Sequence, residues 1–166
     1  MKILLIDGNS VLFRAFYATS FSNIMKTSFG AYTNAVYAFA NMLNKALKMV
    51  EPDYCCVAFD KGKATFRHQM TPDYKAGRKE TPAELVEQFG LVRDMLNAYN
   101  IKYLEYDEIE ADDIIGILAN KFDGDISIFS SDHDLFQLID DNKHIKICCM
   151  KKGMSDIGIL DEKALY

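Results

Sequence analysis

The strongest constraint on the fold is an alternation of short apolar runs with longer amphipathic segments. We expect strands over 2–6, 54–59, 101–104, 126–129 and 145–149. Apolar residues at helical intervals of three and four predict helices over 36–50, 81–100 and 110–121 and a short helix over 135–139. Strands that alternate with helices predict a three-layer, Rossmann-like α/β domain with a central, mainly parallel sheet of about five strands.

Local signals mark some helix ends. The segment Asp7-Gly8-Asn9-Ser10 after the first strand predicts a tight turn and a capped helix. Thr81, Pro82 and Glu84 have the residue types of an N-cap, a first helical position and a capping box, so we expect the helix there to begin at Pro82. Residues 160–164 are expected to open a last helix.

Length and composition exclude several classes of protein. The chain of 166 residues is long enough for one core and has no linker or repeat, so we expect one domain over 1–166. No early apolar run suits a signal sequence or a membrane span, which predicts a cytoplasmic protein without a membrane partner. The cysteines form two adjacent pairs (55–56 and 148–149) without zinc spacing, and we interpret them as core thiols in a reducing compartment.

Acidic side chains follow four of the expected strands. Asp7 ends the first strand and Asp60 the second; the others come after the third or the fourth strand, namely Glu110, Asp112, Asp113, Asp132 and Asp134. Because the carboxyl ends of parallel strands share one sheet edge, these seven carboxylates are expected to converge there. Carboxylates at such short distances from one another repel unless a cation compensates their charge. Oxygen ligands favour Mg²⁺ or Mn²⁺ as that cation. Seven exceed the needs of one ion, which suggests a two-metal site suited to phosphoryl transfer.

Each of these carboxylates also has a purely structural interpretation. An aspartate in a strand-to-helix turn is usually a cap or turn former, and acidic residues in a first helical turn interact favourably with the helix dipole. Asp132 could simply cap its helix, and His133 is interpreted as a surface histidine. These interpretations explain the residues one by one but not their shared sheet edge. The sequence shows neither a Ser-His-Asp or Cys-His nucleophile set nor a GxGxxG motif.

Charge is distributed unevenly. A net charge of −5 argues against nucleic-acid binding. Without the seven proposed site carboxylates, however, 17 acidic residues remain against 19 basic residues, so the rest of the chain carries a net charge of +2. Cations are concentrated in 61–79, with two aromatic residues among them and only one acid: Lys61, Lys63, Phe66, Arg67, Tyr74, Lys75, Arg78 and Lys79. Phosphates pair with such cations while bases stack on the rings, so this segment is a candidate for binding single strands. A solvated loop is the alternative.

Four stretches of the chain resemble the 5′→3′ exonuclease domain of bacterial DNA polymerase I, within the flap endonuclease superfamily. They are LLIDGNSVLFRAFYA (4–18), VAFDKGKATFRHQMTPDYKAGRKETP (57–82), EADDIIGILA (110–119) and SSDHDLFQLI (130–139). They occur in order and span nearly the whole chain. The resemblance implies a PIN-like fold and a metal-dependent nuclease that removes RNA primers and flaps at DNA 5′ ends, on substrates with a 5′ flap, a nick or an RNA–DNA primer junction.

The resemblance also implies roles for individual residues. It assigns Asp7, Asp60, Glu110 and Asp112 to a first metal site, Asp132 and Asp134 to a second, and Asp113 to the outer shell. Helical spacing alone would pair Glu110 with Asp113 instead; we follow the family and expect Glu110 to precede the regular helix.

Segment 61–81 resembles the arch through which a 5′ single strand passes. The resemblance implies that Tyr74, Lys75 and Arg78 belong to this arch and that Arg67 supports it; Lys75 and Arg78 join Asp7 and Asp60 as predicted catalytic residues.

The family continues beyond the point where this sequence ends, into a helix-three-turn-helix module that grips duplex DNA. That module contains a Gly-Asp-x-x-Asp-type motif that completes the second metal site. We therefore expect an intact first site, an incomplete second site, a weak grip on duplex DNA and an apolar surface where the module would dock. A parent protein with a polymerase domain is expected.

Three alternatives remain open from the sequence. The chain could bind nucleic acid or metal without cutting, or it could be a small ribonuclease of the PIN class, which also has an acidic sheet edge. A receiver domain also places aspartates at strand ends, but it should have a lysine beyond the last strand and gives Asp132 and Asp134 no role. Cleavage of 5′-flapped DNA compared with single-stranded RNA separates the ribonuclease from the exonuclease, and an absence of cleavage in Mn²⁺ would favour binding without cutting.

Overall fold

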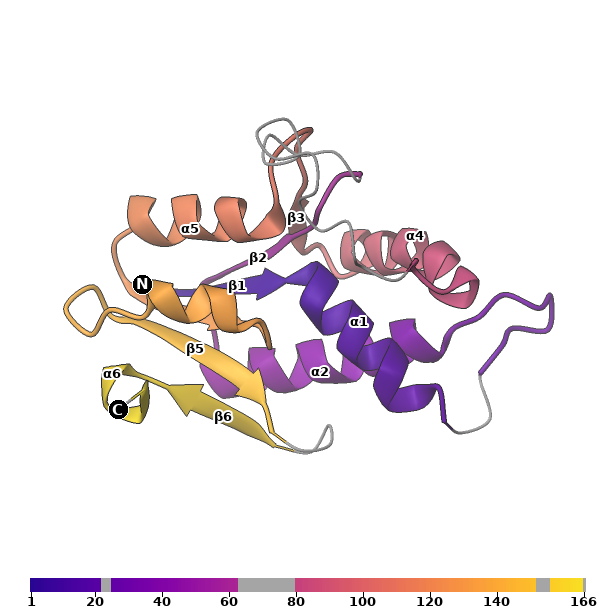
Figure 1. Ribbon diagram of the computed structural model, residues 1–166, viewed down its shortest axis with the longest axis horizontal. Helices are drawn as coiled ribbons and strands as arrows, with labels where there is room; N and C mark the ends of the chain where they lie inside the picture. The colour runs from indigo at the N-terminus through magenta and orange to yellow at the C-terminus, as the bar shows by residue number, and fades with distance from the viewer. Residues whose placement is uncertain (22–24, 63–79, 152–155, 166) are drawn as a thin grey trace.

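A computed structural model describes residues 1–21, 25–62, 80–151 and 156–165 and shows helices on both faces of a six-stranded sheet (Figure 1). The strands are β1 (Lys2–Asp7), β2 (Tyr54–Ala58), β3 (Lys102–Leu104), β4 (Asp125–Phe129), β5 (Ile145–Met150) and β6 (Ile157–Leu160). The helices are α1 (Gly8–Thr19), α2 (Asn34–Val50), α4 (Ala83–Ala98), α5 (Ala111–Lys121) and α6 (Glu162–Leu165), with a 3₁₀ helix η1 (His133–Leu138). The expected three-layer α/β fold is confirmed.

The order of the strands across the sheet is β3-β2-β1-β4-β5-β6, and the first five are parallel. From β1 the chain moves outward through β2 to β3 and then returns to β4 on the other side of β1. Ligand sites of open α/β sheets lie outside the carboxyl ends of the strands at such a reversal of strand order. The fold therefore predicts a ligand site at the carboxyl ends of β2, β1 and β4.

Alternate side chains of the strands supply two apolar cores. Leu4 and Ile6 of β1 face the core that α1, α2 and α4 cover, whereas Ile3 and Leu5 face the core under α5 and η1. All four side chains are at most 5% exposed, as the continuous apolar run of a strand buried on both faces requires. The two cores hold β1 rigidly in the middle of the sheet, and its carboxyl end carries Asp7.

The structure differs from the sequence-based expectation at two places. A sixth strand, β6, pairs antiparallel with β5; the run Ile157–Leu160 is only four residues long and contains Gly158, so it gave no clear strand signal. The expected cap at Thr81 is wrong, because α4 begins at Ala83 and Pro82 is its N-cap, with no side-chain cap bond. Pro82 has extended backbone angles (φ −52°, ψ 137°), and it therefore lies outside the helix.

The interpretation as core thiols is confirmed for Cys148, whereas Cys55 and Cys56 are partly buried against the two cores and Cys149 is half-buried outside them. All four are free, and Cys148 is buried. Burial raises the pKa of the Cys55 thiol to about 12 and that of Cys148 to about 11, so both stay protonated and unreactive near neutral pH. Among the described residues, no helix is both long and apolar enough to cross a membrane.

Candidate active site

A cleft of about 570 Å³ opens at the carboxyl ends of β1, β2 and β4. Half of the residues that line it are acidic, and they come from four separate parts of the sequence: Asp7, Asp60, Glu110, Asp112, Asp132 and Asp134. The structure thus brings six of the seven carboxylates proposed from the sequence to one cleft. Asn9, Ser10 and Phe13 of α1 also line it.

Asp7 joins β1 to α1 and is almost fully buried. One of its carboxylate oxygens accepts a hydrogen bond from the backbone N–H of Ser10 (3.0 Å), which makes Asp7 the N-cap of α1. The other oxygen accepts a hydrogen bond from the Ser130 hydroxyl (2.8 Å), which ties the ends of β1 and β4 together. Only 3% of Asp7 is exposed, and this burial raises its pKa to about 6 despite both hydrogen bonds. The negative charges of Asp60 and Asp132 act in the same direction.

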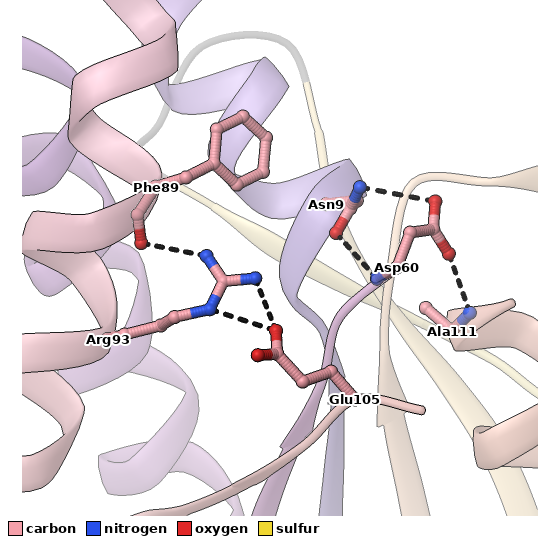
Figure 2. A network of polar contacts seen from close by, with 6 residues as sticks. All are labelled: Asn9, Asp60, Phe89, Arg93, Glu105 and Ala111. Atoms are coloured by element: carbon pink, nitrogen blue, oxygen red, sulfur yellow. Dashed lines mark hydrogen bonds and ion pairs between the residues drawn. The ribbon is translucent and has the colours of Figure 1, made fainter. Parts of the chain in front are cut away.

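Asp60 follows β2 and is held from two neighbouring elements (Figure 2). The Asn9 amide group donates to Asp60 Oδ2 (3.2 Å), and the Asn9 carbonyl oxygen accepts from the Asp60 backbone N–H (3.1 Å). The backbone N–H of Ala111, the first residue of α5, donates to Asp60 Oδ1 (2.7 Å). The Asp60 carboxylate is therefore fixed at the point where β2, α1 and α5 meet.

Gly8, the residue after Asp7, packs directly against the ring of Phe59, the residue before Asp60. A Cβ atom added at Gly8 would lie 2.4 Å from the ring of Phe59, which is fully buried. The guanidinium of Arg93 on α4 lies 4.5 Å from the centroid of the same ring and also forms an ion pair with Glu105 (Figure 2). Glycine is required at position 8 because the aromatic ring takes the space of a side chain.

Glu110 and Asp113 form a reciprocal cap at the start of α5. Glu110 is the N-cap residue, and the Asp113 carboxylate accepts a hydrogen bond from the Glu110 backbone N–H (3.3 Å). Glu110 therefore precedes the regular helix, as expected from the resemblance. Asp113 is not among the residues that line the cleft. The three-residue spacing of these two acids, which is visible in the sequence, thus serves to form a capping box.

Asp112 experiences the combined field of the cleft. Burial raises its pKa to about 7, and the negative charges of four facing carboxylates contribute further: Asp7, Asp132, Asp60 and Glu110. Without a cation, the Asp112 carboxyl group is therefore partly protonated near neutral pH. A bound divalent cation would oppose this shift, because its positive charge favours the ionised carboxylate.

Asp132, His133 and Asp134 follow β4 and line the cleft together. Asp132 caps η1 by accepting a hydrogen bond from the Asp134 backbone N–H (3.0 Å). His133 is exposed and stacks on Phe136, with ring centroids 4.7 Å apart, in agreement with a surface histidine. The capping interpretation is thus correct for Asp7 and Asp132. It is compatible with metal binding, because a carboxylate oxygen that accepts one hydrogen bond keeps a second lone pair.

The chemistry of these residues fits a hard divalent cation, although they do not form a closed cage. Among the described residues, no group of three or more His, Cys, Asp or Glu side chains is arranged to hold a metal ion. Hydrogen bonds from the protein hold four of the carboxylates, namely those of Asp7, Asp60, Glu110 and Asp132. Their donor atoms are all oxygen, and burial together with mutual repulsion raises the pKa of Asp7 and Asp112. Mg²⁺ and Mn²⁺ prefer oxygen ligands of this kind and retain several waters, so a partly open carboxylate cleft suits them.

Most of the predicted arch lies outside the described residues, including Lys63, Phe66, Arg67, Tyr74, Lys75, Arg78 and Lys79. Lys61 is described: its ammonium group forms an exposed ion pair with Asp107 (3.0 Å), in the connection between β3 and α5.

Comparison with known proteins shows the family of the chain and agrees with its fold. The sequence profile described as "5'-3' exonuclease, N-terminal resolvase-like domain" matches residues 2–165. The chain belongs to this family. DNA polymerase I of Geobacillus stearothermophilus is 47% identical to this 5′-3′ exonuclease domain over 159 residues, with 94% of the chain and 18% of the relative covered. The corresponding polymerase of Bacillus subtilis is 44% identical with the same coverage. The chain thus spans about a fifth of the length of these curated relatives.

Solved structures share the fold of this 5′-3′ exonuclease domain. The T5 5′-exonuclease with bound zinc matches the whole chain with a TM-score of 0.70 and 20% identity, over 60% of its own length. The catalytic core of Rad2 in complex with DNA substrate matches 99% of the chain with a TM-score of 0.55 and 17% identity, over 48% of its length. These solved structures show the expected PIN-like fold, and the profile match together with the polymerase relatives confirms the resemblance proposed from the sequence.

Proposed function

We propose that this chain is a divalent-metal-dependent nuclease that hydrolyses phosphodiester bonds near the 5′ ends of DNA, acting as an exonuclease and flap endonuclease. The observation that carries the proposal is the cleft at the sheet edge, where six carboxylates of a 5′-3′ exonuclease domain face one another. Its substrates would be duplexes with a 5′ flap or a nick and RNA–DNA primer junctions.

Two cations would be held by two sets of carboxylates. Asp7, Asp60, Glu110 and Asp112 would hold the first, and Asp132 and Asp134 would hold the second. Asp113, which does not line the cleft, would belong to the outer shell of the site. When bound, Mg²⁺ or Mn²⁺ would neutralise the charge that develops on the phosphate and polarise the attacking water. The zinc-bound T5 5′-exonuclease supports the choice of a divalent cation.

The residues of the chain itself perform the positioning. Ser10 and Ser130 hold the two oxygens of Asp7, while Asn9 and Ala111 hold those of Asp60. These bonds come from fixed elements, so the carboxylates need little reorganisation when the cation and the phosphate arrive.

The predicted arch would bind the 5′ single strand of the substrate. Lys75 and Arg78 would pair with phosphates of the 5′ strand, and Tyr74 would stack on a base, with the remaining cations of 61–79 along the path. The Rad2 catalytic core in complex with DNA supports a DNA substrate. The curated relatives are DNA polymerases, so we further propose action in the cytoplasm in primer and flap removal, beside a polymerase region.

Cleavage of defined substrates tests this function. A 5′-labelled flap duplex and a single-stranded RNA of equal length are incubated with the chain in Mn²⁺, and the same is done with Asp7→Ala and Asp60→Ala. We expect cleavage of the flap duplex near its 5′ end by the wild type, little cleavage of the RNA and none by either variant, both of which should remain folded. Unchanged turnover in either variant would refute the site, and preferential cleavage of the RNA would indicate a ribonuclease.

A further inference from the structure

Asn9 contacts Asp60 at two points with one planar side chain. Its carbonyl oxygen accepts the Asp60 backbone N–H at 3.1 Å, and its amide nitrogen donates to Asp60 Oδ2 at 3.2 Å (Figure 2). Asn9 belongs to the first turn of α1, which is packed against the sheet, so this side chain projects from a rigid element. The other oxygen of Asp60 accepts the Ala111 N–H at 2.7 Å. Two hydrogen bonds thus fix the rotation of the Asp60 carboxylate, and a third fixes the backbone that carries it.

The amide is suited to this task. It presents an acceptor and two donor hydrogens in one plane, and it carries no charge. An aspartate at position 9 would keep the acceptor for the Asp60 N–H, but it would lose the donor to Oδ2 and add a negative charge to the cleft that already holds six carboxylates. Asn9 can therefore orient Asp60 without increasing the repulsion in the cleft.

We propose that Asn9 is a positioning residue that orients the Asp60 carboxylate for the divalent cation. The proposal rests on the metal-dependent function proposed above and goes beyond it, because it assigns the orientation of one ligand to a neutral residue outside the carboxylate set. Hydrogen bonds to a metal-ligating group tune its affinity, and their loss typically weakens metal binding about 10- to 100-fold. In Asn9→Ala, Asp60 keeps the Ala111 bond and can rotate about it, so we expect an effect near about 10-fold.

Direct Mn²⁺ binding tests the proposal without relying on cleavage. Free Mn²⁺ is measured by electron paramagnetic resonance during a titration of the wild type, Asn9→Ala and Asn120→Ala. Asn120 is a matched control: its side chain also makes two hydrogen bonds, to the Gly116 carbonyl (2.9 Å) and from Lys143 (3.0 Å), at an exposed position on α5. We expect Mn²⁺ affinity to fall in Asn9→Ala and to stay unchanged in Asn120→Ala.

The Mn²⁺ dependence of flap cleavage is the second readout. Because a misoriented ligand can still be drawn into place by excess cation, cleavage by Asn9→Ala should need about 10-fold more Mn²⁺ and return close to the wild-type rate at saturation. A general loss of fold would lower the saturated rate instead. Circular dichroism in EDTA checks that the variant is folded.

A second variant keeps the test valid if Asn9→Ala fails to fold. Ala111→Pro removes the N–H that binds Asp60 Oδ1, and proline is favoured at the first position of a helix. Glu110, the residue before it, already has the extended backbone (φ −83°, ψ 157°) that a following proline requires. We expect weaker Mn²⁺ binding in this variant too, because Asp60 is displaced.

The outcomes separate the two proposals. Equal Mn²⁺ affinity in the wild type and the folded Asn9→Ala variant would overturn the positioning role, and so would a loss of cleavage that excess Mn²⁺ does not restore. If the wild type binds Mn²⁺ more tightly than Asn9→Ala but cuts no DNA, positioning stands and the nuclease function fails. A wild type that binds no Mn²⁺ contradicts both.

Discussion

Asp7→Asn should stabilise the metal-free protein at neutral pH, even though it removes a proposed metal ligand. The Asp7 carboxylate is 3% exposed, and burial raises its pKa from 3.8 to about 6. The folded state therefore favours the protonated form more than the unfolded state does. The stability that this proton provides is fully present below pH 3.8 and is lost as the pH rises through about 6.

The size of the effect follows from the difference between the two pKa values. A rise from 3.8 to about 6 corresponds to about 3 kcal/mol of lost stability once the group is ionised in both states. About 2 kcal/mol of this falls between about pH 4.5 and about pH 7.5. Asparagine has nearly the same shape but does not titrate, so the variant should gain about 2 kcal/mol relative to the wild type over that interval.

Urea unfolding in EDTA measures this gain. The wild type and Asp7→Asn are compared at about pH 4.5 and about pH 7.5 by circular dichroism, which gives the free energy of unfolding of each. Asp123→Asn, at an exposed position, is the control that loses a carboxylate outside the cleft. Adding Mn²⁺ at the higher pH should stabilise the wild type more than Asp7→Asn, because the ion binds the folded wild type more tightly.

A difference between wild type and Asp7→Asn that does not change with pH would refute the reasoning. It would mean that Asp7 is either solvated or already compensated in the metal-free protein. Equal stabilisation of both proteins by Mn²⁺ would separately show that Asp7 is not a ligand.

Three further predictions concern the surroundings of the cleft. Gly8→Ala should cost about 1–3 kcal/mol in urea unfolding, because its Cβ would lie 2.4 Å from the Phe59 ring; a neutral result would show that the ring moves freely. Arg93→Ala should cost about 2 kcal/mol, since it leaves a partly buried carboxylate unpaired, and no loss on thermal or urea unfolding would contradict this. Lys75→Ala with Arg78→Ala should weaken flap-DNA binding and flatten its salt dependence, measured by fluorescence anisotropy; an unchanged salt slope would remove both from the phosphate path.

The layer arrangement was predictable because it depends on local pattern. The apolar run of β1 and the helical spacing in α2 are strong signals, and each helix between strands implies a parallel crossover. The order of the strands was not predictable, because it depends on which edge each crossover returns to. The antiparallel β6 was missed for a related reason: its four residues become a strand only by pairing with β5.

The carboxylates of the site were predictable because β1, β2 and β4 end together. Their neutral neighbours were not. Asn9 meets Asp60 across 51 positions of sequence, and no local pattern marks that contact. At Thr81 a local pattern was present but gave a wrong prediction. The residue types matched a capping motif, but Pro82 has an extended backbone and the helix starts at Ala83.

The central claim is that the carboxylate cleft uses a divalent cation to cut DNA near a 5′ end. The most direct measurement incubates a 5′-labelled flap duplex with the wild-type chain, once with Mn²⁺ and once with EDTA, and resolves the products on a denaturing gel. Short labelled products in Mn²⁺ and none in EDTA are predicted. Products that persist in EDTA, or an uncut flap in Mn²⁺, would contradict the claim.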